Sequence, residues 1–538
     1  MVDRGSGLPC PFADSDGMAL PSLAAVRAES RDGPEEGLIT EAAQPFIGKE
    51  LSFRQICELR DAVSRRLAAN GFVADVRIPS QDFAMGDLTL DVVLGRLVAL
   101  RVRGDTGGPT HLVEGQLRPL IESDRALNLY DLERHLREVN AIPGYVIGLT
   151  LRPSQGGREG DLIGTLDVEF RGLRADGNVN NYNDGKVPWI GTVRAEYASL
   201  FGGADRTLLS LFGTLGKPGL RGFQAGQEFQ LGVGGPKLSL TALRATEILR
   251  FGAAAGASAK LRSRSAILTA KASFPLTNSV GFTSHGVLGF DYVDVKVDFF
   301  GPLTRDRLRI VFGQFNAEGE WGAAAPGTLA FASSRPVKAR ASLEVRKGLK
   351  ILNATPTCTF EDPACSSPGV PSSRFEGDAA STVFRASARL EYQPARDVTI
   401  RLAGAGQYSV NPVFADEEFS LGNYTFGRGY PQGVLSGGKG FGLRAELEIG
   451  KARPLSSRGL AFAGYAFGDL GHVSHFGRFS SETIRSLGGG VRGLFGGDAS
   501  IDAMIAVPLK RASLQTVKGN PRFLLTFTSN FLPLPRFR

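Results

Sequence analysis

Residues 441–449 read FGLRAELEI, with apolar and polar side chains in strict alternation. Side chains along a β-strand point alternately to its two faces. One face would therefore carry Phe441, Leu443, Ala445, Leu447 and Ile449. The other would carry Gly442, Arg444, Glu446 and Glu448. The stretch predicts an amphipathic strand with one apolar and one charged face.

The same alternation recurs at 338–346, 384–392 and 398–402. From Arg174 onward, for about 365 residues, short segments of this kind are separated by Gly, Pro, Asn and Asp, without a helical pattern. A soluble sandwich is the alternative, with its apolar faces in a core. Closure into a barrel removes the edges that so long a sheet would expose, and it is obligatory in lipid. No run of about 18 uncharged apolar residues indicates a membrane helix. We therefore predict a transmembrane β-barrel.

The polar faces of these segments are rich in arginine. They carry Arg340, Arg346, Arg385, Arg389, Arg401 and Arg444. An Arg or Lys facing lipid at mid-membrane costs about 2–4 kcal/mol, so we expect these side chains in a water-filled lumen. The net charge of +8 is also typical of nucleic-acid binding. Because the basic residues are spread along the chain, we expect no nucleic-acid partner.

The first 170 residues have a different pattern. Apolar residues at helical spacing predict a helix over 53–70, with Ser52 as N-cap and Gly71 as its stop. Strand-like runs follow at 72–78 and 88–94. A second set follows: strand 97–103, helices 111–121 and 129–139, and strands 145–151 and 162–170. Two small α+β units in tandem are the simplest interpretation.

The four cysteines fall into two pairs. Cys358 and Cys365 have a spacing that allows a small disulfide ring, and Cys10 and Cys57 would join the N-terminus to the first helix. Unpaired thiols are the alternative for both pairs. The five His are scattered, so we predict no metal site, and no catalytic motif with usable spacing points to an enzyme. No signal peptide is visible at Met1.

The N-terminal region also resembles a known protein family. Residues 45–104, from PFIGKELSF to GRLVALRVRG, resemble the first POTRA domain of the two-partner secretion transporters (TpsB) of the ShlB/FhaC/HecB haemolysin secretion/activation type. Residues 97–170, with LNLYDLERHLREVNAIPGY, resemble the second. The best candidate for the first strand is 18–29. The resemblance implies an N-terminal extension at 1–17, POTRA domains at 18–96 and 97–172, and a barrel of about 16 antiparallel strands at 173–538.

The barrel region resembles the same family in three motifs. FSLGNYTFGRGYPQGVLSGGKGFGLRAELE (419–448) is similar to its inward-folded loop and next strand, although Gly427 replaces the usual Val. The motif residues here are Arg428, Gly429 and Tyr430. AFGDLG (466–471) is similar to a strand motif that keeps Phe467, Asp469 and Gly471. RFLLTFTSNF resembles the terminal strand signal ending at Phe531, with Phe537 as an alternative.

The resemblance implies an outer-membrane pore plugged by an N-terminal helix and by a loop at about 414–439, with its POTRA domains in the periplasm. Arg428 would lock the loop to Asp469, because a guanidinium in a lumen needs a carboxylate. A solvated Arg428 and a turn-proximal Asp469 are the alternative. The second POTRA domain would bind the unfolded client by β-augmentation. Its groove would be lined by Leu132, Leu136, Val139, Tyr145, Ile147 and Leu149. The alternative is that these side chains form only the domain core.

The expected partners are a secreted exoprotein of the haemolysin or adhesin type, outer-membrane lipid, and the barrel-assembly machinery during biogenesis. No cofactor is expected. An outer-membrane assembly factor, or barrel insertase, is an alternative function, but its usual extra POTRA domains are missing. A plain porin is a weaker alternative, since it would not need the N-terminal modules.

Overall fold

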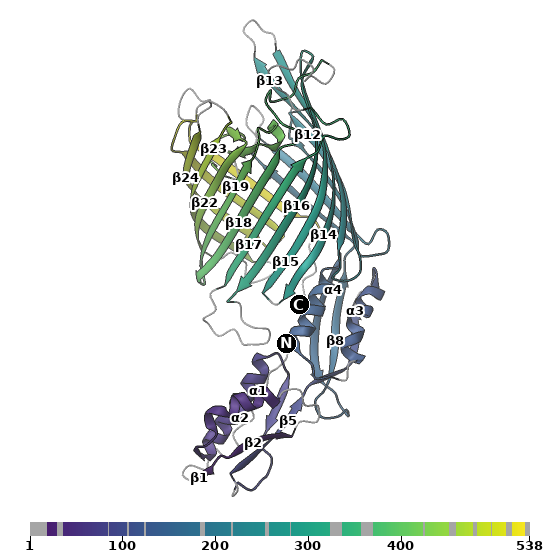
Figure 1. Ribbon diagram of the computed structural model, residues 1–538, viewed down its shortest axis with the longest axis vertical. Helices are drawn as coiled ribbons and strands as arrows, with labels where there is room; N and C mark the ends of the chain where they lie inside the picture. Colours follow the sequence, from purple (N-terminus) through teal and green to yellow (C-terminus); the bar gives the residue numbers. More distant parts are fainter. Residues whose placement is uncertain are drawn as a thin grey trace. The chain divides into compact units, whose positions relative to one another are not determined.

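The chain forms two compact units, one up to Phe170 and the other from Arg171. The fold is known from a computed structural model (Figure 1). The described residues are 19–29, 36–83, 86–104, 107–122, 125–182, 189–216, 219–252, 258–279, 281–322, 336–356, 369–422, 426–450, 459–476, 481–496, 498–512 and 519–532. The expected N-terminal extension, Cys10, Cys358, Cys365 and Phe537 lie outside them.

The first unit begins with a three-stranded sheet of order β2-β5-β4, in which β2 (Ala25–Glu29) is parallel to β5 (Asp87–Leu94). β4 (Ala74–Arg77) runs antiparallel to β5. Helices α1 (Glu36–Ala43) and α2 (Phe53–Ala69) supply the other side of the core. The expected first strand is split in two, because β1 (Ala19–Ser22) pairs separately with β3 (Glu50–Ser52).

Helix α2 begins and ends where the sequence predicts. The Ser52 hydroxyl accepts from the Gln55 N–H at 3.3 Å, and the Gln55 side chain accepts from the Ser52 N–H at 2.8 Å. This reciprocal capping box satisfies two donors that the first helical turn leaves unpaired. Gly71 adopts φ +90°, a conformation that favours glycine after a helix end. The buried face carries Ile56, Leu59, Val63 and Leu67.

A second set of elements repeats this arrangement. β6 (Arg96–Gly104), β8 (Asp161–Phe170) and β7 (Tyr145–Pro153) form a sheet of order β6-β8-β7. Helices α3 (Thr110–Glu122) and α4 (Leu129–Asn140) connect β6 to β7. The repeat agrees with the two tandem α+β units predicted from the sequence. β7 lies at an edge of its sheet, with one side paired to β8.

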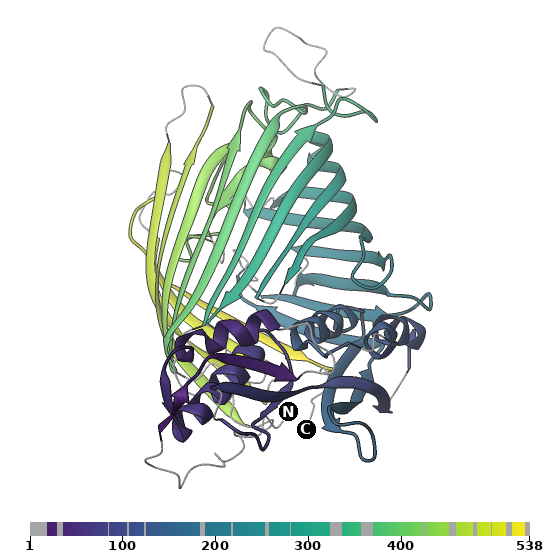
Figure 2. The same cartoon turned by 60° about the horizontal axis from the view of Figure 1, so that its bottom comes forward.

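The second unit is a closed antiparallel barrel in which strands follow one another in sequence order (Figure 2). Its sixteen described strands are β9 (Leu173–Asn180), β10 (Ile190–Ala198), β11 (Asp205–Thr214), β12 (Leu220–Gln230), β13 (Lys237–Gly252), β14 (Ser258–Ser279), β15 (Phe282–Phe299), β16 (Pro302–Trp321), β17 (Val337–Gly348), β18 (Thr382–Ala395), β19 (Val398–Ser409), β22 (Lys439–Gly450), β23 (Leu460–Ser474), β24 (Glu482–Phe495), β25 (Ala499–Pro508) and β26 (Arg522–Asn530). The predicted barrel is confirmed.

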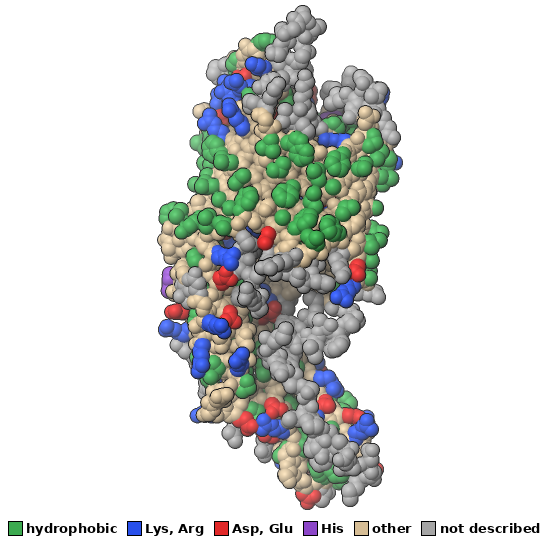
Figure 3. Space-filling model, turned by 180° about the vertical axis from the view of Figure 1, so that it is seen from behind, with side chains coloured by type: hydrophobic (Ala, Val, Ile, Leu, Met, Phe, Trp, Pro, Cys, Tyr) green, Lys and Arg blue, Asp and Glu red, His purple; other side chains and the backbone are tan. Residues whose placement is uncertain are grey.

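The two faces of the barrel wall differ as the alternation predicts. Outward-facing Leu343, Leu443 and Ile449 are exposed, whereas Glu446 and Glu448 on the other face are buried. Hydrophobic side chains form a band on the outside of the barrel in the view of Figure 3. The charged face is therefore the lumen, because hydrocarbon tolerates only the apolar one.

The barrel closes between its first and last strands. The β9–β26 ladder runs from the pair Asp176–Asn530 to the pair Asn180–Thr526. Phe531 continues it, with its N–H donating to the Ala175 carbonyl at 2.8 Å. Within the described part of the chain, no helix has the length and apolar character needed to cross a membrane.

Candidate functional site

The segment that joins β19 to β22 folds into the lumen. We call its described residues 410–422 and 426–438 the inward-folded loop. It contains the 3-10 turn η3 (Ala415–Glu417) and a hairpin of β20 (Phe419–Leu421) with β21 (Leu435–Gly437). Leu421, Tyr430 and Leu435 are buried against Val473 and Ile484 of the barrel wall. The loop is thus packed inside the barrel at the place expected from the sequence.

Arg428 is bound to the lumen wall through a two-pronged ion pair. Its Nε lies 3.1 Å from Asp469 Oδ2 and its Nη2 lies 3.0 Å from Asp469 Oδ1. The Arg428 backbone N–H also donates to Asp469 Oδ2, at 2.9 Å. The two side chains are 1% and 0% exposed. This fork matches the planar guanidinium to the carboxylate and fixes both partners in one geometry.

Two further groups complete the surroundings of Arg428. Its Nη1 lies 3.1 Å from Glu446 Oε2 on β22, and its guanidinium stacks 3.4 Å from the centre of the Phe467 ring. Glu446 in turn contacts Arg492, which also pairs with Asp502 at 3.0 Å. The buried cation therefore has two carboxylates and an aromatic face, as a desolvated charge requires. Sequence reasoning did not assign Glu446 to this site.

The contacts of the loop tip with the wall account for the residue types at Gly429 and Tyr430. A Cβ at Gly429 would lie 2.7 Å from Pro508 N and 2.9 Å from Val507 C, so only glycine permits this approach to β25. The Tyr430 hydroxyl donates to the Lys510 carbonyl at 2.6 Å and accepts from the Lys510 N–H at 3.1 Å. Tyr430 is completely buried. Both residues hold the loop tip against the wall.

Gly471 of the barrel wall also allows close packing of the inward-folded loop. A Cβ there would lie 2.7 Å from Leu421 Cδ1, a side chain of the inward-folded loop. Phe467, Asp469 and Tyr465 share the lumen face of β23 and are all buried. The structure thus brings together all six residues that the sequence placed at the loop-to-barrel lock.

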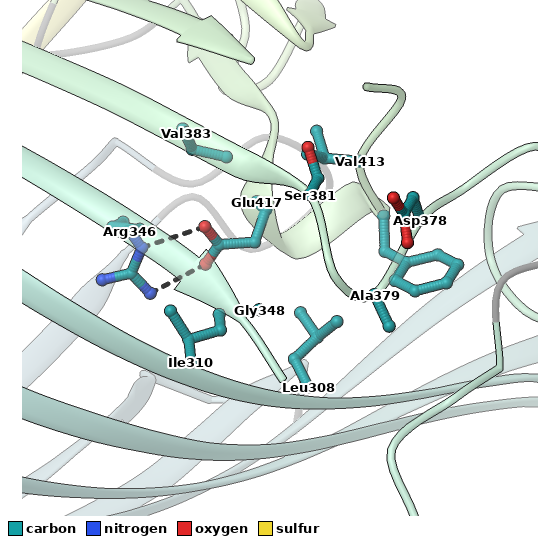
Figure 4. A pocket seen from close by; sticks show the side chains of 11 residues that line it. Leu308, Ile310, Arg346, Gly348, Asp378, Ala379, Ser381, Val383, Val413 and Glu417 are labelled. Carbon is teal, nitrogen blue, oxygen red and sulfur yellow. Dashed lines mark hydrogen bonds and ion pairs between the residues drawn. The ribbon is translucent and has the colours of Figure 1, made fainter. Parts of the chain in front are cut away.

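A second anchor holds the base of the loop. Glu417 accepts two hydrogen bonds from Arg346, Nε at 3.0 Å and Nη2 at 2.9 Å, and a third from Arg385 at 3.2 Å. Figure 4 shows Glu417 facing Arg346 beside Leu308 and Ile310. Sequence reasoning placed both arginines in the lumen but missed their partner, although Asp416, Glu417 and Glu418 form an acidic run in the loop.

A pH-sensitive carboxylate lies beside this second anchor. Asp416 is exposed to the lumen, but the surrounding protein limits its hydration, and this desolvation together with the nearby negative charges of Asp306 and Glu417 raises the pKa of Asp416 to about 6. A raised pKa in the folded state means that ionisation of Asp416 disfavours this conformation. The base of the loop is therefore held most firmly below the ordinary carboxyl pKa, and it loses stability as the pH rises through about 6.

This pH dependence is testable in a planar bilayer. Brief openings of the purified full chain should be more frequent at about pH 7.5 than at about pH 5, and Asp416→Asn should reduce that difference. Glu376→Gln, which removes an exposed carboxylate of a neighbouring segment, is the matched control and should behave like the wild type. An Asp416→Asn variant with an unchanged pH response would contradict the assignment.

The six residues expected in a client groove have mixed positions. Leu132, Val139, Tyr145 and Ile147 are buried in the module's own interior. Their burial agrees with the alternative that these four side chains form the domain core. Leu136 and Leu149 are only partly buried and pack against a cluster formed by Leu97, Leu127, Leu132 and Leu151.

The remaining predicted residues lie apart from the lumen. Cys57 is disulfide-bonded, and its expected partner Cys10 is outside the described residues. The Phe531 side chain is 58% exposed and approaches Gly177 of the first barrel strand. Within the described residues, no cluster of three or more His, Cys, Asp or Glu side chains has the arrangement of a metal site.

Comparison with known proteins is consistent with these features. Residues 332–496 match the family described as haemolysin secretion/activation protein ShlB/FhaC/HecB, and residues 27–95 match the ShlB-type POTRA domain. No curated protein sequence matches the chain.

Three solved structures are similar to this fold. CdiB from Escherichia coli has a TM-score of 0.70 and 16% identity, over 98% of this chain and 94% of its own. CdiB from Acinetobacter baumannii has a TM-score of 0.62 and 15% identity, over 96% and 91%. BamA from Haemophilus ducreyi lacking POTRA domains 1–3 has a TM-score of 0.53 and 10% identity, over 96% and 100%.

The fold and the family matches define an outer-membrane β-barrel transporter with POTRA domains in the periplasm. Within that class, the sequence matches are to the ShlB/FhaC/HecB family, the transporters of two-partner secretion. This family works with a secreted exoprotein partner and is a family of protein-secretion channels rather than of enzymes.

Proposed function

We propose that this transporter captures an unfolded exoprotein of the haemolysin or adhesin type in the periplasm and secretes it through the barrel once the inward-folded loop has moved aside. The observation that carries the proposal is that the loop packs against the barrel wall without joining its hydrogen-bonded ladder. β20 and β21 form a two-stranded sheet of their own, outside the closed ladder. The loop can therefore leave without breaking the backbone hydrogen bonds of the barrel.

The two anchors account for how the loop is retained before a client arrives. The Arg428–Asp469 and Arg346–Glu417 pairs are buried ion pairs between the loop and the wall. Removing one partner of such a pair is costly, because the other charge stays buried without compensation, and this suits a latch that opens as a whole. We propose that the six residues of the predicted lock act in this way. Translocation by this route needs neither catalysis nor a cofactor.

We propose that the client is captured at the free edge of β7. Ile147 is already engaged there, because its N–H donates to Asn140 Oδ1 at 2.7 Å and its carbonyl accepts from Asn140 Nδ2 at 3.1 Å. The backbone N–H and C=O groups of every second residue along a strand point to the same edge. Leu149 and Leu151 therefore direct their backbone groups to the same edge, beyond the reach of Asn140. A client strand would pair there by β-augmentation.

Replacing Leu149 with proline tests the edge. The change removes the outward N–H but keeps the ladder to β8, and proline is tolerated at such edge positions. We expect Leu149→Pro to reduce secretion at least about tenfold, as the loss of pairing at the edge implies. Leu149→Ala is the control, because it shortens the same side chain and keeps the N–H. Equal secretion by the two variants would count against capture at β7.

The proposed function as a whole is tested by co-expression with candidate exoproteins. The partner should reach the medium only when this chain is present. If no exoprotein depends on it while other outer-membrane barrels fail to assemble, the chain acts as an assembly factor instead.

We further propose that β26 with Phe531 is recognised by the barrel-assembly machinery during biogenesis. The strand completes the barrel by pairing with β9, so its insertion is the step that closes the sheet. The apolar band on the outside of the wall would then contact outer-membrane lipid.

A further inference from the structure

The outer wall formed by β13 to β16 continues beyond its apolar band. β9 follows the periplasmic unit directly, and the strands then alternate in direction around the barrel. The end of β15 and the start of β16 therefore lie on the external side of the membrane. At this end the outward-facing side chains change from apolar to charged within a few residues along each strand.

The boundary of the apolar band is marked by aromatic and aliphatic side chains. Leu268 on β14 pairs with Tyr292 on β15, which pairs with Arg309 on β16, all facing outward. The Arg309 guanidinium stacks 3.4 Å from the centre of the Tyr292 ring and donates to the Leu352 carbonyl at 3.1 Å. Tyrosine with a stacked cation is typical of the interface between hydrocarbon and headgroups.

Just beyond this boundary, three cations stand side by side across neighbouring strands. Arg264 pairs in register with Lys296, and Lys296 pairs with Arg305. We call Arg264, Lys296 and Arg305 the basic row. Like charges directly opposite one another destabilise a sheet. Their side chains remain accessible, with exposures of 44%, 36% and 37%.

The acidic side chains nearby do not balance this charge. Asp294 pairs with Arg305 at 2.8 Å, and Asp298 is shared between Arg264 and Lys296, the latter at 3.8 Å. Arg244 and Arg262 also face outward beside the row; Arg262 lies opposite Asp298 in register, whereas Arg244 lies opposite Ala266. The outer face at this level has an excess of positive charge.

We propose that the basic row binds phosphate groups of the anionic glycolipid in the external leaflet, lipopolysaccharide. The location decides the partner: the row adjoins the lipid-facing band on the outside of the wall, so the groups that meet it are lipid headgroups rather than a chain in the lumen. Negatively charged phosphate oxygens would relieve the repulsion between the three cations and would accept hydrogen bonds from the guanidinium groups of Arg264 and Arg305.

The test compares binding of lipopolysaccharide to the purified full chain in detergent with binding to a variant combining Arg264→Gln, Lys296→Gln and Arg305→Gln. Near a lipid surface each Lys or Arg contributes about fivefold in affinity, so we expect the variant to bind roughly 10- to 100-fold more weakly. The wild type should bind phosphatase-treated lipopolysaccharide about as weakly as the variant binds the intact lipid.

A control variant removes three lumen-facing cations instead, with Lys271→Gln, Lys338→Gln and Arg340→Gln, and should bind like the wild type. Heat-modifiable migration on gels verifies that each barrel is folded. If the combined variant does not fold, Lys296→Gln alone should bind about fivefold more weakly. Unchanged binding by the neutralised row, or equal binding of the phosphatase-treated lipid to the wild type, would overturn the proposal.

Discussion

Arg428→Ala is expected to raise the ion conductance of the purified pore and to reduce secretion of the partner at least about tenfold, because a buried ion pair that loses one partner costs about 3–5 kcal/mol. Asp469 would lose the guanidinium fork and keep the backbone N–H of residue 428 at 2.9 Å, the Ser486 hydroxyl at 3.3 Å and Arg444 at 3.8 Å. The loose loop would then compete with the client for the lumen instead of alternating between two defined positions. Single-channel recording and assay of the culture medium measure the two effects.

Two control variants separate the ion pair from a general loss of charge. Arg428→Lys keeps the charge but not the fork, so its conductance should lie between those of the wild type and Arg428→Ala. Arg340→Ala removes a lumen cation whose pair with Glu318 is more than half exposed, and it should have little effect. All three barrels should show normal heat-modifiable migration. Normal secretion with a closed pore in Arg428→Ala would refute the lock.

Deletion of residues 45–170 is expected to abolish export while leaving a folded barrel. All sixteen described barrel strands lie between Leu173 and Asn530, and the ladder closes on itself through β9 and β26. The barrel therefore keeps its complete hydrogen-bonded wall. The deletion removes the β7 edge, where we propose that the client binds. Export to the medium and heat-modifiable migration, measured on the same cells, distinguish the two effects.

Retained export by this deletion would refute the capture role of the periplasmic unit. A barrel that fails to fold would be uninformative on capture, so Leu149→Pro in the full chain provides the second test. That variant changes a single backbone donor and leaves the rest of the unit in place.

The sequence predicted the barrel well, because alternation reports directly on which side of a strand meets lipid. At 441–449 every apolar residue expected to face outward does so, and Arg444, Glu446 and Glu448 face the lumen. The first unit was also well predicted, since Ser52 and Gly71 mark the ends of α2 chemically. Helix α1 was missed: its eight residues, EGLITEAA, are too few to show a helical period.

The site was predicted only in part, because some of its residues lie in a loop that has no periodic pattern. Arg428 and Asp469 stood in recognisable motifs, but Glu417 and Glu446 became partners only through the folding of a long loop onto the wall. Periodicity assigns a face to a strand residue and says nothing of what an irregular segment brings to it. In the same way, the pattern placed Val139 and Ile147 on neighbouring elements without showing that they would be sealed in a core.

Attachment of the loop at both its base and its tip has a consequence for the integrity of the cell envelope. A segment held at two points behaves as a bivalent ligand: when one point detaches, the other keeps it at a high effective concentration and reattachment is fast. Thermal breathing at Arg428 or at Glu417 alone would therefore seldom create a continuous path for ions and nutrients. Leakage requires coincident release at both points, whereas an arriving polypeptide that presses on the whole segment can displace both at once.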